Sequence, residues 1–113
     1  MKLRISGDSI RLRLSRSEVA RFVASGEVED SVHFGGGGEL TYRLQAAASA
    51  EQPRATFDNG HIAVIVPQTD AQKWATTDQV GIEGDGIVVE KDFQCMHGDK
   101  ERDADAFPNP MAN

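Results

Sequence analysis

Apolar and polar residues alternate along the first fourteen positions of this chain. The apolar positions are Leu3, Ile5, Ile10, Leu12 and Leu14, and basic residues stand between several of them. A period of two is typical of strands that bury one face. Residues 6–9 are Ser-Gly-Asp-Ser, and glycine and aspartate favour turns. The pattern therefore predicts a β-hairpin over residues 2–14.

The period then changes to that of a helix. Apolar residues recur at the spacing of one helix face, at Val19, Phe22 and Val23. Ser15 and Glu18 have the spacing of a capping box, in which each side chain bonds a free backbone amide of the other residue. Gly26 is a suitable stop, because glycine adopts the left-handed conformation of a helix end. We therefore expect a short amphipathic helix over residues 15–25.

Strand patterns return at residues 28–34 and 40–44, and four consecutive glycines at 35–38 separate them. A phosphate-binding loop leads from a strand into a helix. This loop leads into another strand, so we interpret it as a hairpin connection.

The same order of elements starts again after the weakly patterned segment 46–52. At a constant offset of 52, residues 3–28 fall on residues 55–80, and Phe22 falls on Trp74. Such self-similarity usually reflects one supersecondary unit used twice. We predict a single α+β domain over residues 1–93, built from a pseudo-twofold duplicated ββαββ unit with halves at about 1–46 and 53–93. Its two short helices are expected to cover an antiparallel sheet or a partly closed barrel.

Residues 94–113 are predicted to form an acidic C-terminal tail that ends in Phe107-Pro108-Asn109-Pro110 and two further apolar residues before Asn113. Prolines favour an extended backbone and exclude a helix. Two interpretations stay open. The tail is either a solubilising end, or a strap in which Phe107 docks into a groove on this protein or on a partner.

Charge is distributed unevenly along the chain. Residues 1–26 carry a net charge of +4 within a protein of net charge −6. The predicted hairpin can place its cations on one face, at Lys2, Arg4, Arg11 and Arg13. This face would bind a small anion or a protein partner, or it would pair with acidic groups of the same chain, including the tail. The acidic chain and the lack of interleaved aromatic residues argue against nucleic acid.

Cys95 is the only cysteine, so no internal disulfide is possible and a reducing cytoplasm is the simplest location. Possible metal ligands gather near it, at His97, Asp99, Asp103 and Asp105, but their spacing is not that of a recurrent zinc site. On a strand, Cys95 and His97 would lie about 7 Å apart, too far for a nucleophile–base hydrogen bond. We therefore predict no catalytic residue, metal or cofactor. No apolar run is long enough to span a membrane, and no signal-peptide pattern opens the chain.

Several motifs resemble those of a family of small uncharacterised bacterial proteins. They are the opening Met1-Lys2-Leu3-Arg4-Ile5 with Ser9-Ile10-Arg11-Leu12-Arg13-Leu14, Glu90-Lys91-Asp92-Phe93-Gln94-Cys95, and the ending Asp105-Ala106-Phe107-Pro108-Asn109-Pro110. The resemblance covers nearly the whole chain. It implies a free-standing bacterial domain of unknown function and supplies no catalytic residue.

Two functional hypotheses follow. The first is a cytoplasmic binding or interaction module without catalysis, monomeric or homodimeric, that presents the cationic hairpin or the tail. The second is a small enzyme or ligand carrier with a pocket where the halves meet, near Tyr42, His61 and Trp74. An exposed apolar surface would favour the first, and a deep pocket with a perturbed titratable group would favour the second.

Overall fold

The strands and helices follow in the predicted order, strand-strand-helix-strand-strand, twice. The computed structural model describes residues 1–93 and 105–108. Its elements are β1 (Lys2–Ser6), β2 (Ser9–Leu14), α1 (Arg16–Ser25), β3 (Glu27–His33), β4 (Glu39–Ala47), β5 (Arg54–Asp58), β6 (His61–Pro67), α2 (Gln68–Thr76), β7 (Gly81–Gly84) and β8 (Ile87–Lys91).

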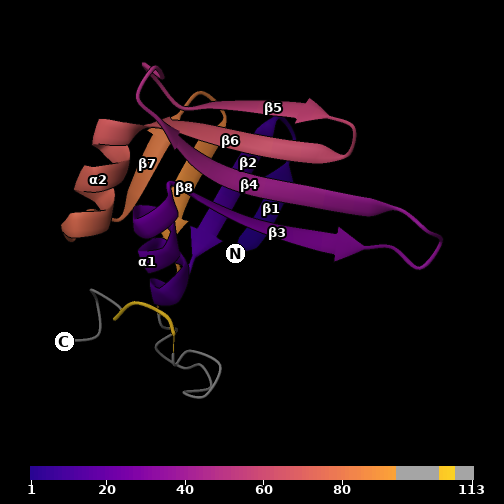
Figure 1. Cartoon of the computed structure of the whole chain (residues 1–113), viewed down its shortest axis with the longest axis horizontal. Helices are drawn as coiled ribbons and strands as arrows, with labels where there is room; N and C mark the ends of the chain where they lie inside the picture. The colour runs from indigo at the N-terminus through magenta and orange to yellow at the C-terminus, as the bar shows by residue number, and fades with distance from the viewer. Residues whose placement is uncertain (94–104, 109–113) are drawn as a thin grey trace.

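The eight strands form two four-stranded sheets (Figure 1). The strand orders are β1-β2-β8-β7 in sheet A and β3-β4-β6-β5 in sheet B. Strands within each hairpin are antiparallel, but the central pairs β2/β8 and β4/β6 are parallel. The prediction of an antiparallel sheet or a partly closed barrel is therefore corrected to two open, mixed sheets. A tight turn enforces antiparallel pairing only within a hairpin, and no tight turn joins the strands that meet at each centre.

The two halves resemble a duplicated unit, and each half contributes one hairpin to each sheet. The hairpins β1–β2 and β7–β8 form sheet A, and β3–β4 and β5–β6 form sheet B. Each helix carries the chain from one sheet to the other, and the two helices lie at the same end of the molecule (Figure 1). The halves are thus interlocked, since neither half contains a complete sheet.

Helix α1 begins and ends where the sequence predicts. Ser15 is its N-cap, and the reciprocal hydrogen bonds of the capping box with Glu18 are both present. Gly26 ends the helix in the left-handed conformation, with φ of 83°. In the hairpin β5–β6, Asn59 and Gly60 have φ of 52° and 77°, the left-handed conformation that an Asn-Gly pair favours in a turn of the primed type.

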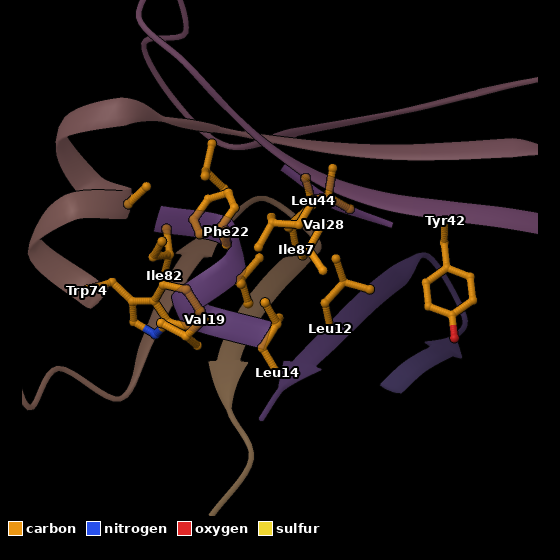
Figure 2. Close-up of a cluster of buried hydrophobic side chains, with 14 of the residues drawn as sticks. Leu12, Leu14, Val19, Phe22, Val28, Tyr42, Leu44, Trp74, Ile82 and Ile87 are labelled. Carbon is orange, nitrogen blue, oxygen red and sulfur yellow. The ribbon is translucent and has the colours of Figure 1, made fainter. Parts of the chain in front are cut away.

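The core lies between the inner faces of the sheets and the two helices (Figure 2). Phe22 of α1 and Trp74 of α2 meet edge to face, with ring centroids 6.2 Å apart and an interplanar angle of 67°. These are the residues that the 52-residue offset relates to each other. Trp74 is fully buried, and its indole Nε1 donates a hydrogen bond to the backbone oxygen of Val80 over 3.0 Å. The largest fully buried side chains are Trp74, Phe22, Leu12, Leu14, Leu44, Val64, Val66 and Val89.

Among the described residues, no helix has the length and apolar character needed to cross a membrane.

The packing of the helices generates a stability prediction. We expect Trp74→Ala to lower the free energy of unfolding by roughly 3–5 kcal/mol, because it leaves a cavity beside Phe22. Val23 lies on the same helix as Phe22 but is 54% exposed. The control Val23→Ala should change the free energy by no more than about 0.5 kcal/mol. Urea denaturation measures both, and similar losses in the two variants would contradict a core centred on the helix pair.

Candidate functional site

The four predicted cationic side chains come from neighbouring strands of sheet A. The register of the hairpin β1–β2 places Lys2 opposite Arg13 and Arg4 opposite Arg11. Directly opposite residues of paired strands share one face of a sheet, and the apolar residues between them lie on the other face. The cations therefore lie together on the outer face of sheet A.

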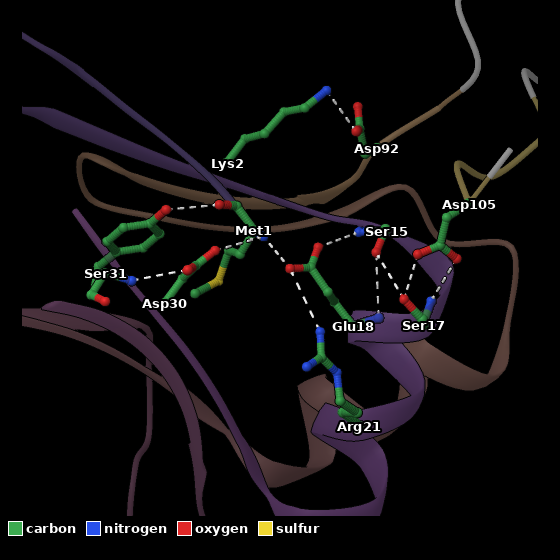
Figure 3. A network of polar contacts seen from close by, with 11 residues as sticks. Met1, Lys2, Ser15, Ser17, Glu18, Arg21, Asp30, Ser31, Asp92 and Asp105 are labelled. Atoms are coloured by element: carbon green, nitrogen blue, oxygen red, sulfur yellow. Dashed lines mark hydrogen bonds and ion pairs between the residues drawn. The ribbon is translucent and has the colours of Figure 1, made fainter. Parts of the chain in front are cut away.

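Acidic residues at the end of β8 neutralise most of this cationic face. Arg13 Nε lies 2.5 Å from Glu90 Oε1, and Arg11 lies 3.6 Å from the same oxygen. The Lys2 ammonium group lies 2.8 Å from a carboxylate oxygen of Asp92 (Figure 3). The intramolecular counter-charges therefore come from β8 and the residue that follows it.

Arg4 makes no ion pair within the described part of the chain. It lines a shallow hollow of about 210 Å³ with Ser6, Ser9 and Arg11. Two guanidinium groups and two hydroxyl groups are suitable partners for a small anion. That role stays a prediction.

The segment Asp105–Pro108 docks on its own domain. Phe107 forms an isolated parallel bridge with Phe93, and its backbone amide donates to the Asp92 oxygen over 2.8 Å. The two phenyl rings meet edge to face with centroids 6.2 Å apart. The buried Lys91 places its ammonium nitrogen 5.3 Å from the centroid of the Phe107 ring. Phe107 thus has an intramolecular site, at the end of β8.

Asp105 completes the start of helix α1 (Figure 3). The first backbone amides of a helix have no partner within the helix. The Arg16 amide donates to the Asp105 backbone oxygen over 2.8 Å, and the Ser17 amide donates to its carboxylate over 3.1 Å. The Ser17 hydroxyl also donates to this carboxylate. Hydrogen bonding from Ser17 lowers the pKa of Asp105 below its ordinary value.

Glu18, in the first turn of α1, lies at the centre of a second polar cluster (Figure 3). Its carboxylate contacts the Met1 ammonium group and accepts a hydrogen bond from the Ser15 amide over 2.9 Å. Burial would raise the pKa of Glu18, but the hydrogen bonds from Met1 and Ser15 outweigh it and hold this pKa below its ordinary value. The cluster joins Met1 to the first turn of α1 through paired charges.

The residues proposed for a pocket between the halves do not converge. Tyr42 is buried and its hydroxyl donates to the Met1 oxygen over 2.9 Å. Trp74 belongs to the core between the helices. His61 is exposed at the start of β6. None of these three side chains lines the hollow on β1 and β2, the hollows beside α1 or the hollow beside β5.

An open apolar groove of about 460 Å³ lies elsewhere at the junction of the halves. Its lining comes from both sheets and both halves, and consists of Ile5, Ile10, Leu40, Ala55, Thr56, Phe57 and Ile62. Phe57 is 70% exposed and Ile5 is 58% exposed. No titratable side chain contributes to the lining. The groove is therefore suited to binding an apolar surface rather than to acid–base chemistry.

Sequence reasoning missed this groove. It placed the apolar lining residues on strands, whose apolar faces are expected to be buried. The signal that could have revealed it is Phe57, a large aromatic residue just before the Asn59-Gly60 turn. Residues beside a hairpin turn often lie at the protein surface, so a large aromatic residue there is a candidate for exposure.

Cys95 and His97 lie outside the described residues, as do Asp99 and Asp103. Residues 1–93 and 105–108 contain no cluster of three or more side chains suited to holding a metal ion. His33 is exposed and its Nε2 lies 3.0 Å from the Glu39 carboxylate.

The docked tail segment generates two predictions. We expect Phe107→Ala to lower the free energy of unfolding by roughly 1–3 kcal/mol, because it removes a partly buried ring and its contact with Phe93. Pro108 is exposed, so Pro108→Ala is the matched control. Denaturant unfolding of the full-length variants measures the difference. Equal stability of Phe107→Ala and the wild type would contradict docking of this segment.

The second prediction concerns pH and Asp105. Its ordinary pKa is 3.8 and its pKa in the folded protein is lower, so the ionised carboxylate stabilises the folded state. Asp105→Ala should therefore be less stable than the wild type at neutral pH. The difference should persist down to about pH 3.8 and shrink as the pH falls through the lowered pKa of the folded state. A difference that grows on acidification would contradict the assignment. Denaturant titrations at a series of pH values measure it.

Comparison with known proteins places the chain in a family. No curated protein and no solved structure matches it. One family model, described as a family of unknown function (DUF7009), matches residues 1–111. Because this match spans nearly the whole sequence, the chain belongs to the family DUF7009, for which no function is known.

Proposed function

We propose that this protein is an interaction module without catalysis that binds an extended polypeptide segment carrying apolar side chains at alternate positions. The observation that supports this most directly is the apolar groove beside β5. Soluble proteins rarely leave large apolar side chains clustered at the surface unless the cluster binds something.

The position of Phe57 favours a polypeptide over a small ligand. Phe57 is on β5, which is an edge strand of sheet B. A segment that pairs with an edge strand gains backbone hydrogen bonds, and it directs every second side chain to the same face. Apolar side chains of such a segment would enter the groove between Phe57 and Ile5. An enclosed cavity would suit a carrier of small ligands better than this open groove does.

The two surfaces expected from the sequence give less support. Glu90 and Asp92 already pair with most of the cationic face. Phe107 contacts Phe93 and Lys91 of its own chain. Binding through Lys2, Arg13 or Phe107 would have to displace these contacts, and Arg4 is the one residue of the cationic face without an ion pair among the described residues.

We further propose that the module works in the bacterial cytoplasm. The support is the single cysteine, which suits a reducing compartment, and the likeness of its motifs to those of small bacterial proteins.

The proposal is tested with Phe57→Ser. Phe57 is mostly exposed, so the substitution should change the free energy of unfolding by no more than about 0.5 kcal/mol. It should nevertheless weaken binding of a fluorescein-labelled heptapeptide, in which valine alternates with threonine, by about tenfold. Fluorescence polarisation measures the affinity.

The matched control is Phe34→Ser. Phe34 is 55% exposed in the loop between β3 and β4 and does not line the groove. This variant should bind the peptide as the wild type does. Equal loss in both variants, or no binding by the wild type, would overturn the proposed function.

A further inference from the structure

Strand β5 is a free and fully exposed sheet edge. It pairs with β6 on one side only, and all five of its residues, Arg54 to Asp58, are exposed. Figure 1 shows it along the upper border of the molecule, with no element beyond it. An exposed edge of this kind is a template for pairing with another strand.

The hairpin turn determines which backbone groups of β5 point outward. Asn59 and Gly60 form a two-residue turn, and in such a hairpin the flanking residues, here Asp58 and His61, exchange hydrogen bonds. Bonded and non-bonded positions alternate along an antiparallel pair. The backbone groups of Ala55 and Phe57 therefore point away from β6 and are free to pair.

We infer that the partner at this edge is a second copy of the chain, joined through antiparallel pairing of β5 with β5 about a twofold axis at Thr56. This register places Ala55 opposite the partner subunit's Phe57, and Phe57 opposite the partner subunit's Ala55. Both pairs use the outward-pointing backbone groups. The same register also joins the two copies of sheet B into one continuous sheet.

The charges of β5 fit this register. Arg54 lies opposite the partner subunit's Asp58, and Asp58 lies opposite the partner subunit's Arg54. Neither residue has an ion-pair partner of its own within the described residues. Opposite charges at directly opposed positions stabilise an antiparallel pair, and twofold symmetry forms the contact twice.

The other three sheet edges lack this complementarity. Strand β1 carries Lys2 and Arg4 with no acidic residue, so two copies would repel each other. Strand β3 carries three acidic residues and no lysine or arginine. Strand β7 has four residues, and Glu83 is its single charge. Like charges on edge strands are a known protection against edge-to-edge association.

The second copy would also extend the groove. Ala55 and Phe57 both line it, so the partner subunit's Phe57 would lie beside Ala55 at the groove's outer side. The inference of a homodimer rests on the proposed function, because it identifies the extended polypeptide that binds this edge as strand β5 of a second copy. The segment Arg54–Asp58 carries apolar side chains at alternate positions, Ala55 and Phe57, as the proposed function requires.

Sedimentation equilibrium of the full-length protein over a range of micromolar concentrations tests the inference. The wild type should show a concentration-dependent dimer. Arg54→Asp and Asp58→Arg should each weaken association by about tenfold or more, because each replaces an attraction by a repulsion at two symmetric positions. The double variant carrying both substitutions should recover the dimer, since it only reverses the direction of each pair.

Glu83→Arg is the matched control, because it makes the same kind of charge change on an exposed edge strand outside the proposed interface. It should dimerise as the wild type does. A monomeric wild type, or a double variant as weak as the single ones, would overturn the homodimer.

Peptide binding separates this inference from the function on which it rests. Asp58→Arg, once monomeric, should bind the uncharged labelled heptapeptide at least as tightly as the wild type. A wild type that binds the peptide but never dimerises would overturn only the choice of partner. Loss of both properties would overturn the proposed function as well.

Discussion

The contact between Phe22 and Trp74 is the interaction on which the arrangement of the two sheets depends. Each helix connects a strand of one sheet to a strand of the other. The packing of α1 against α2 therefore fixes the relative positions of all four hairpins at once. The two aromatic residues occupy equivalent positions of the two similar halves, and their contact lies where the halves face each other. A core of this kind is shared, and neither half has one of its own.

Electrostatic compensation is local in this protein. The basic hairpin is balanced by Glu90 and Asp92, which β8 brings alongside because it pairs in parallel with β2. The docked tail residue Asp105 instead meets the positive end of the α1 dipole, where a carboxylate is stabilised by free amide groups. Acidic residues from the later part of the chain thus meet the basic hairpin and the start of α1 in two separate places, through Glu90 and Asp92 in one and Asp105 in the other.

Local patterns predicted local structure well. The capping box at Ser15 and Glu18 and the turn at Asn59 and Gly60 gave α1 and the hairpin β5–β6, because short-range chemistry decides both. The parallel central pairs were not predictable in this way. They join strands from different halves, so no turn between them constrains their direction. The groove was missed for a related reason: an alternating pattern tells which face is apolar, but not whether another element covers that face.

A difference in strand length explains why part of the apolar face stays uncovered. Strands β3, β4 and β6 of sheet B have seven, nine and seven residues, whereas the strands of sheet A have four to six. The inner face of sheet B therefore extends beyond sheet A at the end away from the helices (Figure 1). Leu40 and Ile62 lie at the starts of β4 and β6, and Phe57 lies near the end of β5. The apolar pattern continues through these positions, although no element among residues 1–93 and 105–108 covers Phe57, which is 70% exposed. Folding alone gives little reason to keep such a residue exposed, and the overhang therefore supports the proposal that this surface binds a partner.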